Sequence, residues 1–100
     1  MYLPWGDGPE NLVPKPLMDH IYSNHSTPMI TWEPWQNLFK NETGQKDEHV
    51  FDHILKGQYD GYITRIAGQL RALNRPVFLR FAHEADNSFY PWSAKGGNTP

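Results

Sequence analysis

Apolar residues repeat at helical spacing in two stretches of the chain. From Asp60 to Leu73 they recur every three or four residues, and Pro76 lies just beyond. Asp60 is a suitable N-cap, and this spacing places the apolar side chains on one helix face. A shorter stretch from Pro16 to Tyr22 has the same spacing and is followed by polar residues. The pattern predicts a helix in each stretch.

Three short apolar runs predict strands. Residues 28–32 form a run of β-type residues bounded by prolines, and the first eight residues are typical of a strand end that runs into a turn. Residues 76–82 are almost continuously apolar apart from Arg80, as in a parallel strand buried on both faces. Residues 36–58 are polar and predict a long connection, with a loop at 41–44 and one helical turn at 49–55.

The order strand, helix, strand, helix, strand is typical of βα units. Right-handed crossovers lay the strands of such units parallel in one sheet, so the predicted fold class is α/β with about three parallel strands and intervening helices. In proteins with parallel sheets, the functional residues lie at the carboxyl ends of the strands. Trp32-Glu33-Pro34-Trp35 and His83-Glu84 both follow predicted strands. We therefore expect any active site at this edge of the sheet.

Composition narrows the classes of partner. The apolar share of 38% is sufficient for a packed core, and the net charge of −2 with scattered basic residues gives no reason to expect nucleic acid. No apolar run approaches the ~20 residues that a membrane span needs, so no membrane partner is expected. The chain has no cysteine. It also has no phosphate loop, dinucleotide fingerprint or convincing metal-ligand set, and we expect neither cofactor nor metal.

The aromatic content is high for a hydrophilic chain. Four Trp, five Tyr and five Phe make up 14% of the residues. Such a mixture suits a sugar site, because pyranose rings stack on flat side chains while their hydroxyls need polar groups around the rim. A tryptophan-rich core accounts for the same composition equally well.

The richest chemistry follows the last predicted strand. Arg80 and Glu84 are four residues apart, which places them on one face if the strand continues. A buried Arg80 needs a partner, and a simple ion pair with Glu84 is one interpretation. His83 and a short aromatic segment beside Glu84 favour a site instead. The following residues are the polar pair Asp86 and Asn87 and the aromatic series Phe89, Tyr90 and Trp92.

This segment resembles glycoside hydrolase family 26, the β-mannanase family of TIM-barrel retaining glycanases. The family motif of arginine, two residues, histidine, glutamate and a short aromatic loop ending in proline and tryptophan is matched by Arg80, His83, Glu84, Tyr90, Pro91 and Trp92. Upstream, the resemblance includes residues 30–35, residues 57–63 and Pro76, and it covers about two thirds of the chain. The chain departs from the family at Asp86-Asn87, and it has Phe89 where tryptophan is common.

The resemblance implies a partial (β/α)8 barrel in which Glu84 is the acid/base of an endo-acting retaining β-glycanase. His83 would orient a carboxylate or a sugar hydroxyl. A guanidinium contact would hold Glu84 as the carboxylate, so we expect Arg80 to bind mainly another partner. The candidate catalytic residues are Glu84, His83 and Arg80. The candidate substrate-binding residues are Phe89, Tyr90, Trp92, Asp86, Trp35 and Trp5.

The family's nucleophile comes from a later strand, and a full barrel takes ~250 residues. We therefore expect residues 1–100 to be a fragment of one catalytic domain, with little or no activity alone, whose remaining partner is the rest of the barrel. Glu33 is assigned a supporting role. The expected substrate is a β-linked polysaccharide, first β-1,4-mannan and then β-1,3-xylan or mixed-linkage β-glucan, and the parent is expected to be secreted. The alternatives are a non-catalytic carbohydrate-binding protein on the same scaffold and an inactive gene fragment.

Overall fold

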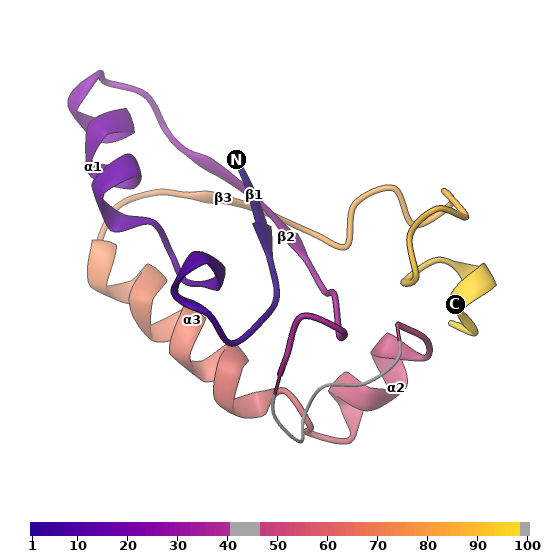
Figure 1. The fold of residues 1–100 in the computed structure, drawn as a ribbon. Coiled ribbons are helices and arrows are strands. Elements are labelled where there is room, and N and C mark those ends of the chain that lie inside the picture. The colour runs from indigo at the N-terminus through magenta and orange to yellow at the C-terminus, as the bar shows by residue number, and fades with distance from the viewer. Residues whose placement is uncertain (41–46, 99–100) are drawn as a thin grey trace.

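Three strands form one sheet, and two helices pack on the same side of it (Figure 1). The computed structural model describes residues 1–40 and 47–98. Within these ranges the elements are β1 (Tyr2–Pro4), η1 (Pro9–Asn11), α1 (Lys15–Ser23), β2 (Met29–Glu33), α2 (Val50–Leu55), α3 (Asp60–Leu73), β3 (Phe78–Phe81) and η2 (Ala94–Gly96). In this described part of the chain, no helix combines the length and the apolar character that crossing a membrane requires.

The predicted helices and strands are confirmed, and so is the α/β fold class. The helical turn expected at 49–55 is α2. Asp60 is the first residue of α3 and not its N-cap, a position that Tyr59 occupies. Asn74 ends α3 in the left-handed region, with φ of 51°, which asparagine tolerates better than most residues. The loop expected at 41–44 lies outside the described residues.

The sheet order is β1-β2-β3, and both strand pairs are parallel. Tyr2 is in register with Thr31, which is in register with Arg80, so these three residues share one face. The next row consists of Leu3, Trp32 and Phe81 on the opposite face. Leu3 and Trp32 are buried in the core with residues of α1 and α3, so the second face is the one that the helices cover.

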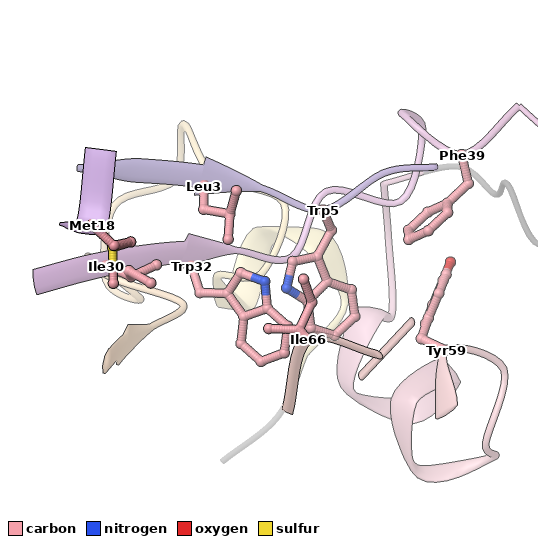
Figure 2. Packing of buried hydrophobic residues seen from close by; sticks show 8 residues of the cluster. All are labelled: Leu3, Trp5, Met18, Ile30, Trp32, Phe39, Tyr59 and Ile66. Carbon is pink, nitrogen blue, oxygen red and sulfur yellow. The ribbon is translucent and has the colours of Figure 1, made fainter. Parts of the chain in front are cut away.

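The core lies between the sheet and the two long helices. Figure 2 shows the indoles of Trp5 and Trp32 side by side below the strands, with Ile66 of α3 against them. Burial of such large apolar side chains is the main favourable term in folding. The buried cluster consists of Leu3, Trp5, Met18, Ile30, Trp32, Phe39, Tyr59 and Ile66.

The expectation that the last strand is buried on both faces is wrong. The apolar residues of β3 are exposed by between 41% and 61%, as Phe78, Leu79 and Phe81 show. The physical reason is position: β3 is the edge strand of the sheet and pairs on one side alone, with β2. Its apolar sequence is that of an interior strand, but no described element covers it. An exposed apolar edge is a surface on which another strand can pair.

Two core tyrosines give this fold a distinctive response to alkali. The Tyr59 hydroxyl donates to Gln36 Oε1 at 2.9 Å, and the Tyr62 hydroxyl donates to the carbonyl of Asn11 at 2.8 Å while accepting from Trp32 Nε1 at 3.1 Å. Burial raises the pKa of Tyr59 and of Tyr62 from 10.0 to about 12. The neutral phenols therefore contribute stability that is complete below pH 10 and is lost as the pH rises through about 12.

Alkaline titration of the folded chain, followed by ultraviolet absorbance, is expected to show Tyr59 and Tyr62 among the tyrosines that ionise late, together with unfolding. In the urea-unfolded chain all tyrosines should ionise near pH 10. Tyr59→Phe and Tyr62→Phe should each remove one of the late-ionising groups. Ionisation of both groups near pH 10 in the folded chain would show that the phenols are not buried.

Candidate active site at the carboxyl ends of the strands

The candidate site lies where β2 and β3 end. β2 ends at Glu33, and β3 is followed at once by Ala82, His83 and Glu84. In Figure 1 the carboxyl ends of the strands point toward the segment that follows β3 and toward α2. Because parallel strands end at the same edge of a sheet, side chains from two distant parts of the sequence meet there.

The backbone leaves the extended conformation sharply after β3. Ala82 has φ of 51° and Glu84 has φ of 53°, both in the left-handed region that side chains other than glycine seldom adopt. The strand alternation expected to carry Arg80 and Glu84 on one face therefore ends at Phe81. Strained backbone of this kind is concentrated at functional sites. In this structure it flanks His83 on both sides.

His83 is the centre of the site. Its side chain is almost fully buried, and its Nε2 lies 3.2 Å from the Tyr90 hydroxyl, 3.7 Å from Glu84 Oε2 and 3.9 Å from Glu33 Oε2. Its Nδ1 is buried and has no hydrogen-bond partner among the described residues. The His83 carbonyl accepts a 2.8 Å hydrogen bond from Trp92 Nε1, which fixes the backbone as well.

The two carboxylates near His83 lie in different environments. The Glu33 side chain is 13% exposed, whereas that of Glu84 is 56% exposed. A carboxyl that exchanges protons with a ligand must be reachable, and Glu84 meets that condition. Glu33 is nearly buried, and its carboxylate faces His83 inside the protein.

A turn organised by Asn87 connects Glu84 to the aromatic residues. The Asn87 amide donates to the Glu84 carbonyl at 2.9 Å, and the Tyr90 amide donates to the Asn87 carbonyl at 3.0 Å. Asn87 Oδ1 also accepts from the amide of Phe89 at 3.0 Å. Asn87 is one of the positions where the chain departs from the resembled family, and its side chain stabilises the turn directly. Asp86 is exposed in the same turn.

Four aromatic side chains form a continuous cluster beside His83. The Tyr90 and Trp92 rings are stacked with centroids 4.6 Å apart, and Trp35 meets Trp92 edge-on at 5.1 Å. Phe89 contacts Tyr90 at 5.1 Å and is 69% exposed, while Trp92 is buried. Such edge-to-face and offset contacts stabilise the cluster beyond simple burial. Phe89 and Tyr90 thus offer the accessible ring surface, and Trp92 supports them from below.

The Tyr90 hydroxyl stays protonated at ordinary pH. Burial raises the pKa of Tyr90, and the negative charges of Glu84 and Glu33 raise it further. A hydrogen bond with Glu84 contributes in the same direction. Tyr90 is therefore a neutral hydrogen-bonding group between the imidazole of His83 and the carboxyl of Glu84.

Arg80 binds a partner other than Glu84. Its Nε and one terminal nitrogen donate to Thr31 Oγ1 at 3.1 Å and 2.8 Å. No ion pair joins Arg80 to Glu84 within the described residues. Thr31 is the register partner of Arg80 on β2, so this contact follows from the strand pairing.

Trp5 lies away from the candidate site, although it was selected from the sequence as a substrate-binding residue. Its side chain is completely buried, with ring contacts to Trp32, Tyr59, Tyr62 and Phe81 at 5.0 to 5.9 Å. A sugar ring cannot stack on an indole that has no free face. The difference arises because Trp5 follows β1 on the helix-covered side of the sheet.

Two residues near the site have no clear signal in the sequence. The Tyr2 ring lies 5.6 Å from that of His83, a proximity that depends on β1 pairing with β2. Gln36 is fully buried and donates from Nε2 to the Glu48 carbonyl at 2.8 Å, while its backbone amide donates to Asp47. These bonds hold the segment that carries Trp35.

No three His, Asp or Glu side chains within residues 1–40 and 47–98 gather as a metal site would require. The arrangement is one of carboxyls, an imidazole, a phenol and aromatic rings. Groups of these kinds are able to exchange protons and to form hydrogen bonds next to an apolar surface.

The chain is similar to part of a much longer protein, Endoglucanase H of Acetivibrio thermocellus. The two are 38% identical over 79 residues, which is 79% of this chain and 7% of that protein. The chain thus spans about 7% of the length of this curated relative. The similarity supports a relationship to glycanases. No family model and no solved structure matches the chain.

Proposed function

We propose that these 100 residues are part of the catalytic domain of an endo-acting retaining β-glycanase and carry the acid/base half of its active site. The observation that carries the proposal is the accessible carboxyl of Glu84 at the end of a parallel strand, 3.7 Å from His83 Nε2 and beside the Tyr90 and Trp92 rings. The similarity to a segment of an endoglucanase points to the same class of substrate.

Glu84 acts first as the proton donor to the leaving glycosidic oxygen. The same group then acts as the base that activates water, as a retaining mechanism requires. The phenol of Tyr90 lies 3.2 Å from His83 Nε2, where it is placed to donate a hydrogen bond to this carboxyl. Phe89, Tyr90 and Trp35 offer the ring surface on which a pyranose stacks.

The nucleophile and the rest of the barrel come from residues outside this chain. Retaining hydrolysis needs a second carboxyl about 5 to 5.5 Å from the acid/base, in a position that allows attack on the sugar. Glu33 is nearly buried and is directed toward His83, so it does not fulfil that role. The exposed apolar edge of β3 is where the next barrel strand pairs. The isolated chain is accordingly expected to hydrolyse little or no polysaccharide.

The substrate is a β-1,4-mannan or a β-glucan. The motif from Arg80 to Trp92 favours mannan through its resemblance to the β-mannanase family, and the name of the similar protein favours β-glucan. The accessible surface contains Phe89 where a larger indole is common in that family. Reducing-sugar release from a panel of mannan, β-1,3-xylan and mixed-linkage β-glucan by the full-length protein distinguishes these substrates.

The proposal is tested by Glu84→Gln in the full-length protein that carries this sequence. A glycanase should lose turnover and keep its affinity for the polysaccharide, measured by calorimetry. A non-catalytic carbohydrate-binding protein should show no turnover before or after the change and should keep its affinity, and that outcome would overturn the proposed function. Circular dichroism of the variant establishes that the fold is intact.

A further inference from the structure

The side chain of Glu33 is nearly buried at the end of β2. Its backbone carbonyl accepts hydrogen bonds from the amides of Trp5 and Trp35, both at 2.8 Å, so the residue is held firmly in place. Its carboxylate is directed to His83, with Oε2 3.9 Å from Nε2. Burying a carboxylate away from water costs free energy unless a hydrogen-bond donor or a positive charge faces it. In the described residues, His83 is the ionisable group that fulfils this requirement.

The imidazole of His83 is surrounded unevenly. Three oxygens, from Tyr90, Glu84 and Glu33, face Nε2 at 3.2, 3.7 and 3.9 Å, while Nδ1 has no hydrogen-bond partner in the described part of the chain. The proton therefore belongs on Nε2, where acceptors lie. Nε2–H then donates to the Tyr90 oxygen, and the Tyr90 hydroxyl is free to donate to Glu84.

We propose that Glu33 is a positioning residue for the proposed reaction, acting on Glu84 through His83 and Tyr90. This inference rests on the proposed function. The negative charge of Glu33 holds the imidazole with its Nε2–H facing the carboxyls, and it competes with Glu84 for that N–H. A hydrogen bond from Nε2–H to Glu84 alone would stabilise the carboxylate form of Glu84 and oppose proton donation.

The test uses Glu33→Gln and Glu33→Asp in the full-length protein, with two kinds of substrate. An unactivated polysaccharide needs a proton donor for its leaving group, whereas a dinitrophenyl glycoside does not. We expect Glu33→Gln to lower kcat/KM for the polysaccharide by roughly tenfold to a hundredfold, which is part of the ~10²–10⁴-fold that acid catalysis supplies. The kcat/KM for the dinitrophenyl glycoside should change little. Glu33→Asp keeps the charge and should retain more activity than Glu33→Gln.

The matched control is Glu10→Gln, which removes an exposed carboxylate and should alter neither substrate's kinetics. A second measurement needs no activity: the ¹⁵N resonance of His83 Nε2 in the full-length protein should move in Glu33→Gln. If Glu33→Gln does not fold, Glu33→Asp decides through its kcat/KM on the two substrates: a fall on the polysaccharide alone supports the inference, and equal falls on both substrates, or no fall, would overturn it.

Equal losses on both substrates in Glu33→Gln would mean a general structural role and would overturn the inference. An unchanged kcat/KM on the polysaccharide would do the same. Failure of the proposed function is recognised separately, because the unmodified protein would then show no turnover, or its turnover would survive in Glu84→Gln.

Discussion

Glu84→Gln in the full-length protein is expected to lower kcat/KM for an unactivated β-glycan by about 10²–10⁴-fold, the usual contribution of a general acid/base. Glutamine keeps the shape of the side chain but can neither give a proton to the glycosidic oxygen nor take one from water. For a dinitrophenyl β-glycoside the first step needs no proton, so kcat/KM should be almost unchanged. Its kcat should fall, because hydrolysis of the covalent intermediate then proceeds without a base to activate water and becomes the slow step.

Azide provides the control for this expectation. As an anion it attacks the covalent intermediate without a base, so it should restore kcat for the dinitrophenyl glycoside in Glu84→Gln and yield a glycosyl azide. It should have no effect on the unmodified protein. An equal loss of kcat/KM for both substrates, with no response to azide, would remove Glu84 from the acid/base role.

Trp92→Ala is expected to produce the largest loss of stability among the site residues. Trp92 is 1% exposed, stacks on Tyr90, meets Trp35 edge-on and donates to the His83 carbonyl. Truncation of a buried tryptophan costs about 3 to 5 kcal/mol, against a total stability of about 5 to 15 kcal/mol for a typical domain. Urea denaturation of the 100-residue chain, followed by circular dichroism, measures the difference.

The matched control is Phe89→Ala in the same cluster. Phe89 is 69% exposed, so its removal should change the free energy of unfolding by about 0.5 kcal/mol or less. In the full-length protein the same change should weaken glycan binding, since Phe89 offers free ring surface. Similar stability losses in the two variants would mean that the segment after β3 does not pack as described.

The local elements follow from the sequence because their signals are local. The spacing of apolar residues from Asp60 to Leu73 predicts α3, although its N-cap is Tyr59 and not Asp60. The short β-type runs predict β2 and β3, and their order along the chain predicts a parallel sheet. The grouping of His83 and Glu84 with the aromatic segment could also be anticipated, because these residues follow one another closely after the end of β3.

Long-range pairing decided the rest. The sequence of an apolar run does not show whether the strand is central or at an edge. Among the described strands, β3 pairs only with β2, and Phe78 and Leu79 are exposed. Register also decided that Arg80 binds Thr31. The alternation of side chains along a strand does not show which face the helices cover. The structure places Trp5 on the covered face, so it lies in the core and not in the site.

Glu33 and His83 are fifty residues apart in sequence, and a parallel sheet brings them within 3.9 Å. The sequence by itself determined the α/β elements and the identity of the chemical groups, because residue type and spacing are properties of the chain. The tertiary structure alone decided which of those groups are neighbours, since contacts between strands depend on how distant segments pair.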